Sequence, residues 1–146
     1  FAGVGPFAVP MASRGATVLA VDVNPVAVRY CRENARRNGV EERVEAVEAD
    51  VRDVARERPD TADRLVMNLP HSASEFLDAA VTLAGDDCVV HLYDIQHEDD
   101  PFGPAVAAAE TTVEGTGYEV EVVDRRVVRS YAPHEVNVRA DLRLTR

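Results

Sequence analysis

Apolar residues occur along this chain in short β-branched runs separated by helix-like segments. The continuous runs cover residues 17–22, 43–48, 64–67 and 88–94. Such runs are typical of strands buried on both faces of a parallel sheet. Segments with helical patterning cover residues 6–13, 24–38, 74–84 and 105–114. Residues 118–129 and 136–144 instead alternate apolar and polar side chains, which predicts an antiparallel hairpin at one sheet edge.

This order predicts an α/β fold with a mostly parallel sheet, in one domain over residues 1–146. Apolar residues make up 46% of the chain, which is enough for a core. No apolar run approaches the ~18 residues of a membrane span, and no signal peptide is visible. We therefore expect a cytoplasmic protein that does not bind membranes. Cys31 and Cys88 show neither metal nor redox spacing and are interpreted as buried thiols of a reducing compartment.

The charge of the chain is unusual in kind as well as in amount. The formal net charge is −10, from 26 acidic and 16 basic residues, and every base is an arginine. Such a charge repels itself in dilute buffer, whereas salt shortens the screening length to ~3 Å at 1 M. The composition therefore favours a salt-adapted cytoplasm, such as that of a halophilic archaeon, over ordinary acidic drift.

A salt-adapted origin predicts that the melting temperature rises from dilute buffer to molar KCl, because the screened carboxylates repel each other less. Thermal unfolding followed over a KCl series measures this. A flat or falling curve would contradict the halophilic interpretation.

The first residues combine a glycine turn with an acid at the end of the next strand. Gly3 and Gly5 permit a tight turn and a close approach of a ligand, and Pro6 suits a first helical position. Asp22 ends the following strand, at about the ~20-residue spacing of a ribose-binding acid. A helix-capping role before Asn24 is the simpler alternative. Because a glycine loop of this kind follows a strand, we expect a strand before residue 1.

Two further polar residues end strands along the chain. Asp50 suits an adenine amino group, or is a solvated loop acid. Asn68, before Leu69 and Pro70, presents a carboxamide to a planar nitrogen-bearing substrate, or caps the next helix. The sequence pattern of a dinucleotide-binding site is matched only in part, because Ala8 stands where a third glycine is preferred. No residues suited to hydride transfer follow it. This layout is that of the Rossmann-like class I S-adenosylmethionine-dependent methyltransferases, with the first strand missing.

Several motifs make the resemblance more specific. They are Phe1–Phe7, Asp22–Pro25, Asn34-x-x-x-Asn38, Asp50–Asp53, Ala62–Pro70, Ser72–Leu77, and Tyr131–Pro133 with Asn137-Val138. Together they resemble the archaeal and eukaryotic tRNA (guanine-N1)-methyltransferases, which act on the guanosine after the anticodon. A sister group that transfers an aminocarboxypropyl group in wybutosine synthesis shares the glycine loop. It typically carries Met-Gly-Tyr where this chain has Met67 to Pro70, which favours the methyltransferase.

The resemblance implies S-adenosylmethionine as the cofactor, tRNA as the partner and no metal, and we expect a monomer. Asn68 and Pro70 are the predicted catalytic residues. The predicted cofactor contacts are Phe1, Gly3, Gly5, Asp22, Val23, Asp50, Val51 and Asn68. The family's catalytic arginine and glutamate and its tRNA-gripping domains would lie before residue 1, so residues 1–146 alone should barely methylate tRNA. Another class I methyltransferase and a non-catalytic nucleoside-binding module stay as alternatives.

The remaining polar candidates have simpler interpretations. His71 is predicted to be a rim residue, His91 a satisfied core histidine within a strand, and His97 and His134 loop residues without metal spacing. Arg125, Arg126 and Arg129 could contact phosphates, but alternating strand charges more often form a solvated face.

Overall fold

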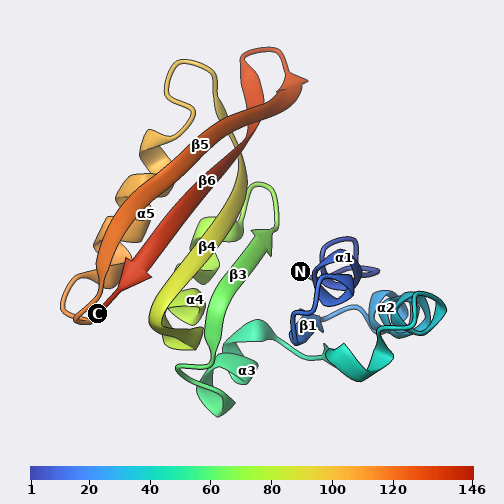
Figure 1. The fold of residues 1–146 in the computed structure, drawn as a ribbon. Helices are drawn as coiled ribbons and strands as arrows, with labels where there is room; N and C mark the ends of the chain where they lie inside the picture. Colours follow the sequence, from blue (N-terminus) through green and yellow to red (C-terminus); the bar gives the residue numbers. More distant parts are fainter. The chain divides into compact units, whose positions relative to one another are not determined.

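The computed structural model describes residues 1–146, and the chain divides into two compact units, Phe1–Val54 and Ala55–Arg146 (Figure 1). Each unit contains its own sheet, of two and of four strands. The one-domain interpretation stays a prediction. None of the helices is long and apolar enough to cross a membrane.

The first unit is built on a pair of parallel strands, β1 (Val18–Asp22) and β2 (Val44–Glu48). Its helices are α1 (Ala8–Ser13), α2 (Pro25–Arg37), the 3₁₀ turn η1 (Glu41–Arg43) and the first turn of α3 (Val51–Glu57). One face of the strand pair packs on α1 and α2 through small side chains. The buried members of this core are Ala8, Ala20, Val28, Cys31 and Ala46.

Helix α2 has the boundaries that its end signals predict. The Asn24 side chain accepts hydrogen bonds from the backbone N–H groups of Val26 and Ala27, which caps the helix. Pro25 occupies the first turn, where a missing N–H costs nothing. Asn38 ends the helix and Gly39 follows with a φ of +64°, the left-handed conformation that glycine adopts readily.

One prediction about the helices of this unit is wrong, and one helix was missed. Helix α1 begins at Ala8 rather than at Pro6, because Gly5 and its neighbours form a turn in which the Gly5 N–H bonds to the Ala2 carbonyl. Helix α3 was not predicted at all, since its residues are mostly polar. The side chain of Asp50 caps it by accepting a hydrogen bond from the Arg52 backbone N–H at 2.9 Å.

The second unit is a four-stranded sheet in the order β3-β4-β6-β5. Its strands are β3 (Ala62–Asn68), β4 (Ala84–His97), β5 (Glu119–Ala132) and β6 (Glu135–Thr145). β3 and β4 are parallel, whereas β6 runs antiparallel to both β4 and β5. The structure confirms the predicted α/β class and the carboxyl-terminal hairpin, with β5 as the edge strand.

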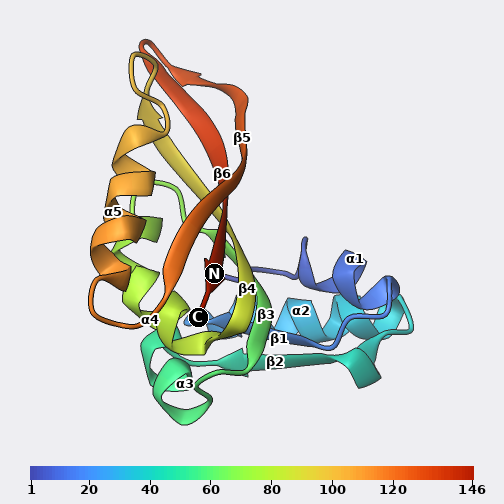
Figure 2. The same ribbon diagram turned by 60° about the vertical axis from the view of Figure 1, so that its left-hand side comes forward.

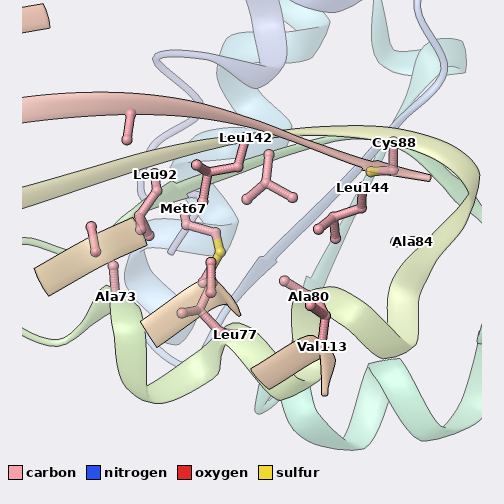
Figure 3. Packing of buried hydrophobic residues seen from close by; sticks show 14 of the residues in the cluster. Met67, Ala73, Leu77, Ala80, Ala84, Cys88, Leu92, Val113, Leu142 and Leu144 are labelled. Atoms are coloured by element: carbon pink, nitrogen blue, oxygen red, sulfur yellow. The ribbon is translucent and has the colours of Figure 1, made fainter. Parts of the chain in front are cut away.

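One face of this sheet is covered by helices α4 (Leu77–Leu83) and α5 (Gly103–Val113) (Figure 2). Side chains from the strands and from both helices form its core (Figure 3). The labelled members are Met67, Ala73, Leu77, Ala80, Ala84, Cys88, Leu92, Val113, Leu142 and Leu144. No helix of this unit covers the opposite face, which is therefore lined by the alternate side chains of each strand.

The sequence misplaced several boundaries in this unit, including the end of β4, which lies at His97 rather than at Asp94. The helix predicted over residues 74–84 is a 3₁₀ turn, η2 (Ala73–Phe76), followed by the short α4. Gly85 does not close that helix but lies in β4, which begins at Ala84 rather than at Cys88. The buried Tyr118 hydroxyl donates a hydrogen bond to the Ala84 carbonyl, a long-range contact that local patterning does not reveal.

Both cysteines are buried and unpaired, as predicted. Burial raises the pKa of the Cys31 thiol, and it raises the pKa of Cys88 to about 12. Both side chains therefore stay protonated at neutral pH and act as small apolar groups.

Candidate functional site

The carboxylate of Asp22 joins the glycine turn to the end of β1. One oxygen accepts the Gly3 N–H at 2.8 Å, and the other accepts the Asn24 N–H at 2.9 Å. The Ala2 N–H also bonds to the Val21 carbonyl at 3.0 Å, so the segment from Phe1 runs beside β1. Each carboxylate oxygen has two lone pairs. Asp22 thus organises the turn and keeps acceptor capacity for the hydroxyls of a ribose.

The two glycines of this turn have different physical roles. Both have positive φ, +56° at Gly3 and +88° at Gly5. A Cβ on Gly3 would meet nothing within 4 Å, so this position leaves open space for a ligand. A Cβ on the buried Gly5 would lie 3.0 Å from the Sγ of Cys31 on α2. Gly5 is therefore required by helix packing as well as by its backbone conformation.

This difference predicts a stability effect. Replacing Gly5 by alanine should lower the free energy of unfolding by about 1–3 kcal/mol, from the left-handed conformation and the contact with Cys31. Gly15→Ala is the matched control, because Gly15 has a φ of +97° and open space at its Cβ. Chemical denaturation of both variants measures the difference. Equal losses would show that packing on Cys31 contributes nothing.

Helix α2 holds the turn from a second side. The Asn34 side-chain amide donates a hydrogen bond to the Val4 carbonyl at 2.8 Å. In the sequence, Asn34 stands out only as part of a spaced pair with Asn38, and that pattern indicates no role for it. A turn between two glycines needs an anchor such as the Asn34 amide, and this need was the signal that could have identified Asn34.

Val23, next to Asp22, is 67% exposed and thus available to pack on a planar ring.

Asp50 lies at the same edge as Asp22, because it follows β2, whose last residue pairs with Asp22 in the parallel ladder. Its carboxylate is engaged by Arg52, whose Nε donates to Oδ1 at 2.9 Å. Val51 next to it begins α3 and is half-buried. The first unit thus brings the predicted contacts Gly3, Asp22 and Asp50 to one strand-end edge.

In the second unit, Asn68 is the last residue of β3 and opens a tight loop. The Ser72 N–H bonds to the Leu69 carbonyl at 3.1 Å, and His71 adopts a φ of +74°. Leu69 packs against the core, which fixes the start of the loop next to Pro70. The side-chain amide of Asn68 makes no hydrogen bond within the protein. A half-exposed amide held on a rigid strand end is available to recognise the edge of a planar base.

The buried carboxylate of Asp94 supports this loop, and the sequence analysis did not identify it. Its side chain is 4% exposed and accepts hydrogen bonds from the backbone N–H groups of His71 at 3.2 Å and Ile95 at 2.8 Å. The Gln96 side chain donates to its second oxygen at 2.7 Å. Asp94 therefore holds His71 in its left-handed conformation, three residues after Asn68.

Asp94 is thus a positioning residue, and its removal should act through the loop. In a protein that uses Asn68, Asp94→Ala should lower kcat about 10-fold or more, because the His71 N–H loses its buried acceptor. Asp94→Asn retains an acceptor oxygen and should restore most of that loss. Steady-state kinetics with a melting curve for each variant measures the effect. Wild-type kcat in Asp94→Ala would contradict this role.

Two of the histidine predictions differ from the structure: His97 is the last residue of β4 rather than a loop residue, and His91 is only partly buried rather than a core residue. His91 is satisfied within β4, with Nδ1 2.7 Å from an Asp141 oxygen and Nε2 2.8 Å from Nη1 of Arg64. His97 and His134 lie near the β5–β6 turn, where their rings stack 5.9 Å apart. Since a guanidinium only donates, Nε2 of His91 accepts and its Nδ1 donates to Asp141.

The first unit carries a glycine turn with acids at its strand ends, and the second carries an amide at the end of β3. Both units have the α/β architecture in which ligands bind at the carboxyl ends of parallel strands. Residues 1–122 match the model of the TRM5/TYW2 methyltransferase domain, and the chain belongs to this family. This confirms the resemblance inferred from the motifs. The salt-adapted origin stays a prediction.

Relatives with named activities cover almost the whole chain. The chain is 38% identical over 145 residues to the tRNA (guanine(37)-N(1))-methyltransferase Trm5b of Pyrococcus abyssi. This alignment covers 99% of the chain but only 42% of that relative, so the chain spans less than half of its length.

Two solved structures relate the fold to ligands. M. jannaschii TYW2 in complex with AdoMet superposes with a TM-score of 0.92 at 32% identity, covering 100% of this chain and 66% of that one. The complex of aTrm5 with tRNALeu superposes with a TM-score of 0.81 at 31% identity, and the match covers 98% of this chain and 39% of that one.

Proposed function

We propose that this chain is the catalytic domain of an S-adenosylmethionine-dependent methyltransferase that methylates N1 of the guanosine following the anticodon of tRNA. The observation that carries the proposal is the 38% identity, over 99% of the chain, to a relative named for this reaction. The chain is 32% identical to the TYW2 structure, and the higher identity to the methyltransferase favours methyl transfer over aminocarboxypropyl transfer. The Met67 to Pro70 sequence supports the same choice.

The residues of the first unit fit an adenosine group. Gly3 leaves open space where a side chain would stand, and Asp22 retains lone pairs for both ribose hydroxyls. The exposed Val23 offers an apolar surface to a purine ring, and Asp50 with Val51 lies at the neighbouring strand end. We assign these residues, with Phe1 and Gly5, to the cofactor pocket.

When bound, S-adenosylmethionine supplies a methyl group that its sulfonium already activates. The protein then has mainly to align donor and acceptor, and alignment alone can supply a large part of the acceleration. Asn68 would accept a hydrogen bond from the N–H edge of the guanine and so fix the ring. Pro70 keeps the strand-end loop rigid. The N1 proton must leave as the N1–C bond forms, which needs a base, and the resemblance assigns that base to a glutamate outside residues 1–146.

The test uses the full natural chain that contains these residues. Tritium transfer from S-adenosylmethionine is measured on unmodified tRNA with guanosine after the anticodon, and on the same transcript with adenosine there. We expect label only in the guanosine transcript, and mass analysis should identify N1-methylguanosine. An aminocarboxypropyl product would establish the sister activity. Cofactor binding without any transfer would establish a non-catalytic module, and transfer to protein or small molecules a different methyltransferase.

Two other expectations from the sequence belong to this proposal. The protein would act in the cytoplasm, where tRNA is modified, and as a monomer. Sedimentation of the full natural chain at several concentrations tests the second.

A further inference from the structure

The helix-free face of the four-stranded sheet carries a chain of paired charges. Arg64 on β3 contacts His91 on β4, and His91 contacts Asp141 on β6. Arg139 lies 3.0 Å from the same Asp141 oxygen and donates to Asp124 on β5 at 2.6 Å. The carboxylates of Asp141 and Asp124 are therefore already paired with protein bases.

Two arginines on the same face have no acidic partner. Arg126 lies directly opposite Arg139, and Arg129 lies opposite Asn137. Asp141 and Asp124 already balance the charge of Arg139, so the guanidinium of Arg126 is the one left without an acid in this pair. Residues 125–134 contain three arginines and no acid, although the chain has a net charge of −10. The third, Arg125, points to the helix-covered face, where its guanidinium lies 6.0 Å from the Phe102 ring.

The sheet register aligns Arg126 with the strand-end amide. Asn68 pairs with Tyr93, Tyr93 with Arg139, and Arg139 with Arg126, in one row across the four strands. Met67 and Leu92, the residues before Asn68 and Tyr93, point into the core, so this row lies on the helix-free face. Three strand spacings place Arg126 about 14 Å from Asn68. A polynucleotide carries a charge about every 3.4 Å along each strand, so its backbone has several phosphates within that distance.

An aromatic contact also connects β5 to the loop after Asn68. The Tyr131 ring lies 5.5 Å from the His71 ring at 72°, and Tyr131 is 50% exposed. An exposed ring beside arginines is how proteins hold single-stranded RNA, with bases stacked on rings and phosphates bound by guanidinium groups.

We infer that Arg126, Arg129 and Tyr131, here termed the β5 surface, bind the RNA backbone and a base next to the target nucleotide. The inference rests on the proposed tRNA substrate. It replaces the interpretation of Arg126 and Arg129 as a solvated face, because neither the absence of acidic partners for these arginines nor the register of Arg126 with Asn68 was visible in the sequence. It also offers this acidic chain a local binding surface for a polyanion.

The test compares two double variants of the full natural chain, saturated with S-adenosylmethionine. Arg126→Gln with Arg129→Gln removes two charges from the β5 surface. Arg14→Gln with Arg37→Gln removes two charges from exposed positions on or next to α1 and α2 and is the matched control. The probe is a fluorescent anticodon stem–loop RNA with guanosine after the anticodon, and its Kd is measured by anisotropy from about 0.1 to 1 M KCl.

The β5 double variant should raise Kd about 10- to 100-fold at the lowest salt and reduce the slope of log Kd against log salt by about 1.4. The control should stay within about twofold, and the cofactor Kd should not change in either variant. Tyr131→Ala should weaken binding about 10-fold without changing the slope, because stacking releases no counterions. A general loss of folding would not separate these two responses.

Equal weakening in both double variants, or none in either, would overturn the inference. So would self-association of the β5 double variant without loss of RNA binding, because the arginines would then protect an exposed sheet edge. Tritium transfer by the wild-type protein reports separately on the proposed function. Transfer to tRNA with unchanged RNA binding by the variant would overturn this inference alone. RNA binding lost only in the β5 variants, without methyl transfer, would overturn the proposed function alone.

Discussion

Replacing Asn68 by alanine should lower kcat for tRNA methylation about 100- to 1,000-fold in the full natural chain, while the Kd for S-adenosylmethionine stays nearly unchanged. This amide stands at the end of β3 without a hydrogen-bond partner in the protein, so its removal leaves nothing unsatisfied in the folded state. The amide would contribute to catalysis through its hydrogen bond to the guanine edge as the N1 proton leaves. Removing one preorganised hydrogen-bonding group of this kind typically lowers kcat about 100- to 1,000-fold. A fall in kcat and kcat/KM together marks an interaction made in the transition state.

The matched control is Asn38→Ala, which removes an exposed amide at the end of α2. Its kinetics should match the wild type. Single-turnover tritium transfer separates the chemical step from product release, and titration calorimetry measures the cofactor Kd. If Asn68→Ala weakened cofactor binding as much as turnover, Asn68 would belong to the cofactor pocket alone. If kcat were unchanged, the catalytic assignment would be wrong.

Local signals predicted the parts of the fold that depend on neighbouring residues. Asn24, Pro25 and Gly39 set the ends of α2 through capping and backbone conformation, which need only adjacent atoms. The β5–β6 hairpin followed from strict alternation. The start of β4 at Ala84 did not, because it depends on Tyr118, which lies 34 residues away in sequence. Helix α3 also escaped prediction, although Val51, Val54 and Ala55 have helical spacing, because it is only 7 residues long and its cap, Asp50, was interpreted as a ligand contact.

The site divides in the same way. The positions of Asp22 and Asn68 at strand ends could be predicted because a change of pattern marks where each strand stops, and their roles in binding and catalysis stay predictions. The residues that hold them could not be predicted. Asn34 bonds to Val4 across 30 positions, and Asp94 bonds to His71 across 23. The sequence also could not show that Gly5 is fixed by Cys31 whereas Gly3 faces open space.

Replacing Asp22 by alanine should weaken S-adenosylmethionine binding by about 1–3 kcal/mol, or about 5- to 150-fold in Kd, because both ribose hydroxyls lose an acceptor. The structure adds a second cause. Asp22 also accepts the Gly3 and Asn24 N–H groups, so the glycine turn loses its attachment to β1. Both causes act on binding, and kcat at saturating cofactor should change much less.

Hydrogen exchange can separate the two causes. If the turn loosens, the Gly3 and Asn24 amides should exchange faster in Asp22→Ala without cofactor, whereas the Ala20 amide inside β1 should not change. Glu42→Ala is the matched control, since it removes one exposed acid from the same unit. Its cofactor Kd and amide exchange should equal those of the wild type. Titration calorimetry of both variants completes the comparison, and an unchanged Kd in Asp22→Ala would remove Asp22 from the cofactor pocket and leave it only the turn-organising role that its two hydrogen bonds show.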